Sequence, residues 1–133
     1  MKTLNVVCGL IFSEDGRLFL ARKAQGMPHQ GKWEFPGGKI ESGEEPQIAL
    51  QRELLEELDM EIDVLAFLGS NIHEYPDLRV KLNAYKCRLV RFGEQLTDHD
   101  AFVWILPNEL FFYDLAEADI PLAKLISKEC KNE

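Results

Sequence analysis

The sequence predicts an α/β (α+β) protein in which a mixed β-sheet is covered by helices on both faces. Two observations carry this prediction: β-rich segments recur along the chain, and two helical patterns, one early and one near the end, interrupt them. The chain of 133 residues is 46% hydrophobic and 29% charged, which is typical of a globular domain. We therefore expect a single domain that spans residues 1–133.

The first β-hairpin is predicted near the N-terminus. Residues 3–13 are β-rich and lead to the Asp15-Gly16 pair, which is typical of a hairpin turn. Residues 17–22 then return as the partner strand. A loop with two glycines and a proline follows at residues 25–32. The remaining strand-like segments are residues 33–36, 62–71, 80–90 and 102–106, with a turn at residues 73–78.

The longest helical pattern covers residues 46–58. Pro46 suits the first turn of a helix, where its missing N–H costs nothing, and no Gly or Pro follows before the pattern ends. The apolar residues expected to share the core-facing arc are Ile48, Leu50, Leu54, Leu55 and Leu58. A single helical turn is predicted at residues 107–113 and a last helix at residues 120–127.

Three carboxylates crowd another face of the same helix. At 100° per residue, Glu53, Glu56 and Glu57 fall within an arc of about 100°. Like charges at this spacing repel each other, and acids in the last turn of a helix oppose its dipole. The arrangement fits either a solvated acidic face or a site that holds a cation.

The spacing of residues around this helix resembles the Nudix box. The matching residues, between positions 38 and 60, are Gly38, Glu44, Arg52, Glu53, Leu54, Glu56, Glu57 and Met60. One position differs, because the family usually has Gly where this chain has Asp59. A left-handed helix cap is expected there, and Asp tolerates that conformation less well than Gly. The resemblance implies the α/β/α sandwich of the family, with a mixed sheet between helices.

Markers outside the box resemble the MutT-type branch, whose members hydrolyse nucleoside triphosphates to the monophosphate and pyrophosphate. They are WEFPGGKIE at residues 33–41, Arg22-Lys23, Trp104 with Leu106-Pro107, and ADIPLAKL near the C-terminus. The ADIPL segment resembles the CTP pyrophosphohydrolase subgroup more than the 8-oxo-dGTP sanitising enzymes, which tend to have Asn in place of Asp119. The resemblance implies a hydrolase of CTP, dCTP or 5-modified cytosine nucleotides, with 8-oxo-dGTP as the alternative substrate.

The same resemblance assigns the metal ligands and the catalytic residues. The ligands would be Glu53, Glu56, Glu57 and the backbone carbonyl of Gly38. Oxygen ligands of this kind suit Mg²⁺, and Mn²⁺ accepts the same ligands. Glu53 and Asp98 would be the catalytic carboxylates near the attacking water. The alternative for Asp98 is a residue that caps its loop.

Three further residues are expected to support the box. Arg52 and Glu44 can form a bidentate pair, which would fix the loop against the helix. Gly37, like Gly38, permits close approach of the backbone. The GxxxxGK[ST] motif is absent, so these glycines are not expected to form a phosphate-binding P-loop.

The expected substrate contacts lie outside the box helix. Arg22 and Lys23 are candidates for the phosphate chain, or else they mark an exposed strand end. Asp119 is a candidate for the base, because an ionised carboxylate accepts hydrogen bonds from an exocyclic amine such as N4 of cytosine. Glu34 would supply a second acceptor or, if protonated in an apolar pocket, a donor to a ring nitrogen or carbonyl. The alternative for Asp119 is a cap of the last helix. Tyr75 is expected either to stack on the base or to pack on the core.

The histidines and cysteines are not expected to bind metal. His29, His73 and His99 lack metal-ligand spacing, and His99 is interpreted as a loop residue. The 3 cysteines contain no CxxC pair and are expected to be free thiols in a reducing compartment.

Charge and hydropathy limit the partners. A net charge of -8 argues against a surface that coats nucleic acid, and it suits a protein that reaches polyanions through a divalent metal. No signal peptide pattern opens the chain, and no apolar run approaches the roughly 18 residues of a membrane span. We expect a cytoplasmic protein whose partner is a nucleoside triphosphate, with no obligate protein partner. The contrasting class, a Nudix-like module that binds nucleotides without hydrolysis, is disfavoured because all three box carboxylates are present.

Overall fold

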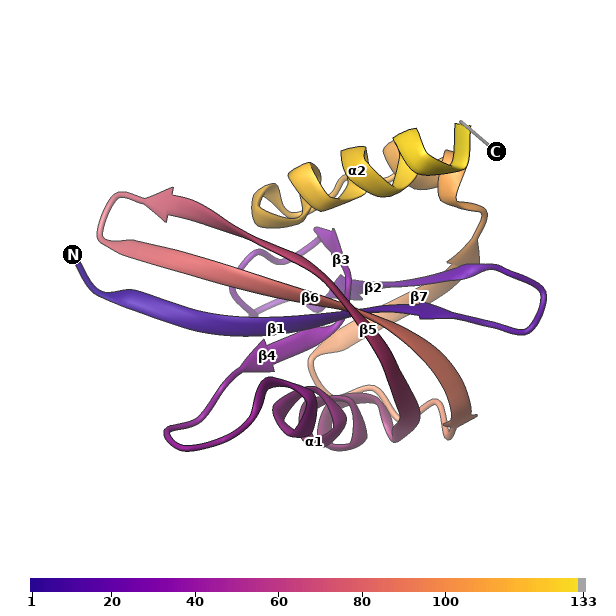
Figure 1. Ribbon diagram of the computed structural model, residues 1–133, viewed down its shortest axis with the longest axis horizontal. Helices are drawn as coiled ribbons and strands as arrows, with labels where there is room; N and C mark the ends of the chain where they lie inside the picture. Colours follow the sequence, from indigo (N-terminus) through magenta and orange to yellow (C-terminus); the bar gives the residue numbers. More distant parts are fainter. Residues whose placement is uncertain (132–133) are drawn as a thin grey trace.

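The computed structural model describes residues 1–131 and shows a mixed β-sheet between two α-helices (Figure 1). The strand order is β3-β2-β1-β6-β5, with β4 paired to β1 and β7 paired to β2. The strands are β1 (Thr3–Phe12), β2 (Leu18–Lys23), β3 (Trp33–Glu34), β4 (Gly37–Lys39), β5 (Met60–Tyr75), β6 (Leu78–Phe92) and β7 (His99–Ile105). The helices are α1 (Pro46–Leu58) and α2 (Ile120–Lys131), with short 3₁₀ helices η1 (Pro107–Phe112) and η2 (Glu117–Asp119). The α/β/α sandwich is therefore confirmed.

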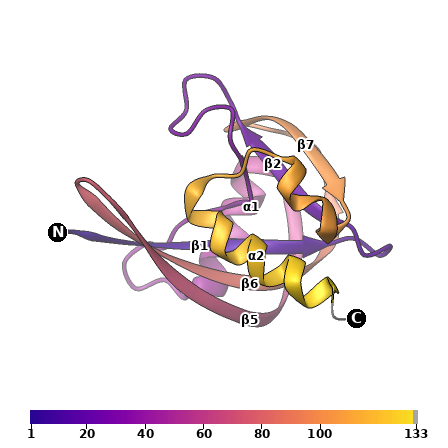
Figure 2. The same cartoon turned by 90° about the horizontal axis from the view of Figure 1, so that it is seen from above.

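The sheet is mixed because β1 runs parallel to β6, while the other pairings are antiparallel. The β5–β6 hairpin is longer than predicted: it closes at Tyr75↔Leu78, so the turn needs only Pro76 and Asp77. The residues before this turn continue the ladder instead of forming a loop. The tip of the hairpin lies beside the N-terminus in both views, where Arg79 N donates to the Lys2 carbonyl at 2.9 Å (Figures 1 and 2).

Each face of the sheet packs against its own helix. Side chains alternate along β1 and β2, so that Leu10 and Leu20 face α2 whereas Ile11 and Phe19 face α1. Figure 1 shows α2 above the sheet and α1 below it. The two cores are separate, and the backbone of the sheet lies between them.

The face of α1 that meets the sheet differs from the predicted one. Ile48 and Leu55 were expected in the core but are 53% and 48% exposed, and Ala49 is buried in their place. The helix is turned so that Leu50 packs closely on β1 beside Gly9, where an added Cβ would lie 3.4 Å from Leu50 Cδ2. The same rotation brings the Glu53 side of the helix towards β4.

The C-terminal end of α1 is capped by a segment far along the chain. Asp59 adopts the predicted left-handed conformation, with φ 53 and ψ 46. Residues 93–97 then supply backbone donors to the last carbonyls: Gly93 to Asp59 (2.8 Å), Gln95 to Leu58 (3.3 Å) and Thr97 to Glu57 (3.1 Å). These bonds satisfy carbonyls that a helix leaves unpaired, and they fix the start of β7 against α1.

The last helix begins at Ile120 as predicted and continues to Lys131. Within residues 1–131, no helix is both long and apolar enough to cross a membrane.

Candidate functional site

Arg52 lies at the centre of the box carboxylates. Its guanidinium donates to both oxygens of Glu44, from Nε to Oε2 at 2.8 Å and from Nη2 to Oε1 at 2.9 Å. Nη1 lies 3.1 Å from Glu53 Oε1 and 3.4 Å from Glu56 Oε2, and Nη2 donates to the Lys39 carbonyl. The bonds from Arg52 lower the pKa of Glu44 to about 2. Arg52 therefore places a positive charge among the crowded carboxylates and ties the loop to α1.

Glu57 is in a different environment from its two box neighbours. Its Oε2 atom is buried and has no hydrogen-bond partner among the described residues. Burial, followed by the nearby carboxyl groups of Glu53 and Asp98, raises the pKa of Glu57 to about 9. A carboxyl group in this position is favourable when it holds a proton or when a cation lies beside it.

The two glycines of β4 are in close contact with their neighbours. A Cβ at Gly38 would lie 2.3 Å from Glu53 Cδ, and a Cβ at Gly37 would lie 1.9 Å from the Val7 carbonyl oxygen. Both distances are too short for any side chain, so only glycine fits here without displacing atoms. The Gly38 backbone therefore lies directly beside the Glu53 carboxylate.

The box carboxylates fit a hard divalent cation in their chemistry. Within the described residues, however, no three His, Cys, Asp or Glu side chains are already grouped as a ligand set. Arg52 contacts Glu53 and Glu56, and the Glu56 side chain is 60% exposed, so it is free to turn away from Arg52. The unpartnered oxygen of Glu57 is the strongest sign that these residues suit a cation.

Asp98 is brought to the box by the segment that caps α1. Thr97 donates to the Glu57 carbonyl through its backbone N–H at 3.1 Å and through Oγ1 at 3.3 Å. The Asp98 carbonyl accepts from Ala24 N at 3.0 Å. The structure thus places the Asp98 carboxylate close enough to Glu57 to raise its pKa.

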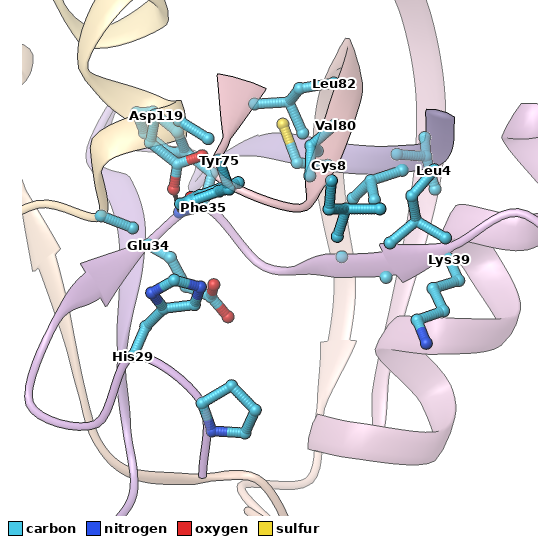
Figure 3. Close-up of a pocket in the computed structure, with 18 of the residues that line it drawn as sticks. Leu4, Cys8, His29, Glu34, Phe35, Lys39, Tyr75, Val80, Leu82 and Asp119 are labelled. Carbon is cyan, nitrogen blue, oxygen red and sulfur yellow. Dashed lines mark hydrogen bonds between the residues drawn. The ribbon is translucent and has the colours of Figure 1, made fainter. Parts of the chain in front are cut away.

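A cavity of about 530 Å³ adjoins the box (Figure 3). It lies between β1, β4, the tip of the β5–β6 hairpin and η2. Gly38 belongs to its lining, so the cavity meets the box at the glycine that contacts Glu53. Much of the wall is apolar, including Leu4, Val6, Phe35, Val80 and Leu82. Three acidic residues line the same cavity: Asp77 in the hairpin turn, and Glu34 and Asp119, which are labelled in Figure 3.

Asp119 is a buried acid at one end of the cavity. It is 5% exposed, and its Oδ2 accepts a hydrogen bond from Phe35 N at 3.1 Å. Burial, followed by the charge of Glu34, raises its pKa well above the usual value. Its side chain is hydrogen-bonded to the backbone of Phe35, which is distant in the sequence. This contact does not fit the alternative in which Asp119 caps the last helix.

Two residues, one from β2 and one from β7, contact the Glu34 carboxyl group. His99 Nε2 lies 2.8 Å from Glu34 Oε2, and Lys23 Nζ lies 3.7 Å from the same oxygen. His99 is 4% exposed and begins β7, so its interpretation as a loop residue is wrong. It pairs with Lys23 across a register shift between Arg22 and Lys23, and no local sequence signal reveals such an irregularity.

Arg22 and Tyr75 occupy different surroundings. Arg22 lies outside the lining of the large cavity: its Nε donates to Asp100 Oδ1 at 2.7 Å, and its guanidinium lies over the Trp33 ring. With Lys23 it lines a smaller hollow of about 280 Å³. Tyr75 lines the large cavity, where its ring centroid lies 5.6 Å from that of His29. The structure therefore brings Lys23 and Tyr75 to the cavity but not Arg22.

Comparison with known proteins gives the family. A model of the NUDIX domain matches residues 1–127, so the chain belongs to the Nudix family, and it is a hydrolase of that family. A relative from Escherichia coli (strain K12) named CTP pyrophosphohydrolase is 38% identical over 122 residues, covering 92% of this chain and 90% of that protein. An 8-oxo-dGTP diphosphatase of the same strain is 38% identical over 82 residues, covering 62% of this chain and 64% of that protein. The solution structure of the E. coli ORF135 protein has a TM-score of 0.78 and 39% identity, covering 93% of this chain and 88% of that chain.

Proposed function

We propose that this chain is a Mg²⁺-dependent nucleoside triphosphate pyrophosphohydrolase that prefers cytosine nucleotides. Water attacks the β-phosphorus, and the products are the nucleoside monophosphate and pyrophosphate. One observation carries the proposal: a largely apolar cavity, lined by Glu34 and Asp119 among its few acidic residues, adjoins the box carboxylates at Gly38. The similarity to a CTP pyrophosphohydrolase along most of both chains supports the same substrate class.

The box residues would hold the metal. The ligands are Glu53, Glu56, Glu57 and the Gly38 carbonyl, with Mn²⁺ as a possible substitute for Mg²⁺. Such an ion neutralises phosphate charge, orients a water molecule and eases its deprotonation. The side chains of Glu53 and Asp98 both lie near the Glu57 carboxyl group, and either can accept the proton of the attacking water.

Cationic side chains near the cavity would contact the negatively charged phosphate chain. Lys23 is the residue that lines both the large cavity and the smaller hollow, so its ammonium group can reach a phosphate from the base pocket. Arg22 is held by Asp100, and it contacts the phosphates only if that pair opens. We therefore assign Lys23 the main phosphate contact and Arg22 an outer one.

The base is read by an acceptor and a donor. Glu34 lies beside Lys23, and its carboxylate accepts from the N4 amine of cytosine. The raised pKa of Asp119 favours the neutral acid, whose O–H donates to the ring nitrogen N3. At the same edge, uracil and thymine present a carbonyl acceptor in place of the N4 amine and an N–H donor in place of the bare N3. A mismatched buried polar group costs about 1–3 kcal/mol, or roughly 10–100-fold in kcat/KM.

The test is pyrophosphate release from a panel of nucleotides with and without Mg²⁺. The panel holds CTP, dCTP, UTP, dTTP, ATP, GTP and 8-oxo-dGTP. We expect a cytosine nucleotide to exceed UTP and dTTP by about tenfold or more in kcat/KM, and Asp119→Leu, which has no donor for N3, to reduce this ratio without abolishing hydrolysis. Much faster hydrolysis of 8-oxo-dGTP would overturn the cytosine preference and favour the second candidate, which the similarity to 8-oxo-dGTP diphosphatases supports. Full turnover in excess EDTA would refute the metal requirement.

A further inference from the structure

His99 is a buried histidine that none of the roles above uses. Its side chain has no exposed area, and it does not belong to the lining of the cavity. Its Nε2 atom lies 2.8 Å from Glu34 Oε2, whereas its Nδ1 atom is buried and has no hydrogen-bond partner among the described residues. A substrate in the cavity therefore does not touch His99, but it does touch the carboxyl group that His99 holds.

The unpartnered Nδ1 atom decides how the proton is placed on the ring. A proton on Nδ1 would create a buried donor without an acceptor, and the bare Nε2 would then face a carboxylate oxygen. With the proton on Nε2, the ring donates to Glu34 and leaves only a lone pair unpaired. Lys23 Nζ lies 3.7 Å from the same Oε2. The geometry thus places the ring proton of His99 on Nε2.

We infer that His99 is a positioning residue for base selection: it fixes the Glu34 carboxyl group so that its other oxygen faces the cavity as an acceptor. The inference rests on the proposed function in one respect, namely that the cavity binds a nucleotide base. Both His99 and Lys23 use Oε2 of Glu34, so Oε1 is left for the amine of the base.

The groups around Glu34 show why Lys23 alone does not fix the direction of its carboxylate. Four groups from different elements face it: Lys23 from β2, His99 from β7, Asp119 from η2 and Cys8 from β1. Cys8 is buried, and its pKa is raised by burial and then by the two carboxyl groups, so it stays a neutral thiol. Lys23 lies beyond hydrogen-bond distance and has a flexible stem. His99 is therefore the group that fixes the direction of the Glu34 carboxylate.

Two substitutions separate positioning from packing. His99→Gln keeps an N–H donor at a reach similar to that of Nε2, and His99→Leu fills the space without a donor. We expect His99→Leu to reduce the wild-type preference between cytosine and uracil nucleotides by about tenfold, chiefly through KM, with a smaller change in kcat. His99→Gln should restore most of the preference. Thermal melting of both variants reports on folding separately.

A double-mutant cycle removes the remaining ambiguity. In a Glu34→Ala background there is no carboxylate to position, so His99→Leu should leave the base preference unchanged. An equal loss of preference in both backgrounds would mean that His99 acts only through packing and would overturn the inference. Two-bond ¹H–¹⁵N spectra of the histidine rings give an independent check, because a proton on Nδ1 of His99 would also overturn it.

The outcomes distinguish the inference from the proposed function. If the wild-type protein does not prefer cytosine nucleotides, the proposed substrate is wrong, whatever His99 does. If the wild type prefers another base and His99→Leu reduces that preference only while Glu34 is present, the positioning role stands with a different substrate. If the wild type prefers cytosine and His99→Leu retains the full preference, the positioning role is refuted alone.

Discussion

The backbone of Gly38 lies so close to the carboxyl group of Glu53 that a Cβ at position 38 would be 2.3 Å from Glu53 Cδ. The group that blocks this Cβ is the end of a flexible side chain, not backbone. The absence of a side chain at position 38 therefore allows the Glu53 carboxylate to lie where it does. Gly38 also lines the cavity, so this contact is at the cavity wall.

The first prediction compares two alanine substitutions in adjacent residues. Gly38→Ala should fold with nearly the wild-type melting temperature, because Glu53 can move aside, but kcat should fall by about 10²-fold or more as that carboxylate is displaced. Gly37→Ala should instead lower the melting temperature strongly, because its Cβ would meet the Val7 carbonyl oxygen at 1.9 Å. Thermal melting and pyrophosphate release are measured on both. Full activity of Gly38→Ala would show that the Glu53 position does not matter.

The second prediction concerns the pH dependence of stability in EDTA. Glu57 has a pKa raised to about 9 in the folded protein, so the folded state binds its proton more tightly than the unfolded state. Stability from this group is fully present below the unfolded pKa and is lost as pH rises towards the folded one. The melting temperature should therefore fall between about pH 6 and pH 9, and Glu57→Gln should flatten the decline.

Adding Mg²⁺ should offset the fall in melting temperature that occurs as the pH rises. A cation replaces the proton on Glu57, so the increase in melting temperature on adding Mg²⁺ should be larger near pH 9 than near pH 6, by roughly the amount that the proton no longer supplies. An equal increase at both pH values would show that Glu57 does not bind the metal.

The third prediction ranks the carboxylates. Glu53→Gln, Glu56→Gln and Glu57→Gln should each keep the fold and lower kcat by about 10²-fold or more, the scale of losing a ligand or a proton acceptor. Asp98→Asn should have a smaller effect, since the amide keeps the shape and the contact with Glu57. The measurements are kcat at saturating Mg²⁺ and the melting temperature. If Asp98→Asn is the most damaging of the four, the general base lies outside α1.

The fourth prediction concerns the left-handed cap of α1. Asp59 is left-handed, so Asp59→Gly removes strain, but the structure also pairs Asp59 Oδ1 with Arg91 Nη2 at 2.7 Å. The two effects oppose each other, and the melting temperature should change by less than about 3 °C instead of rising. In an Arg91→Ala background the pair is already absent, so Asp59→Gly should then be stabilising. A clear rise in both backgrounds would mean that the Asp59–Arg91 pair contributes nothing.

The sequence predicts the order of elements well because its local signals agree with the fold. The bounds of α1 follow from Pro46 and the left-handed Asp59, and the first hairpin follows from its Asp15-Gly16 turn. The spacing of Glu53, Glu56 and Glu57 also marks the box without any structural information.

What the sequence does not predict depends on contacts between distant residues. The side of α1 that faces the sheet follows from its close packing on Gly9, which overrides the most apolar arc of the helix. The burial of His99 depends on an irregularity in the pairing of β2 with β7. The short strand β4 forms because Gly37 and Gly38 lie against β1, and two glycines have no intrinsic strand preference.

The parallel pairing of β1 with β6 has a consequence for how the protein folds. β1 cannot complete its pairing until β6 is available, and β2 cannot complete its pairing until β7 is available. The sheet is therefore closed by contacts between residues far apart in the sequence. Such closures are slow, because the chain loses much entropy before the contacts stabilise it. The base pocket needs Leu4 from the first strand and Asp119 from the last 3₁₀ helix. A chain emerging from the ribosome therefore gains its nucleotide site only after Asp119 has been made, long after the box helix itself is complete.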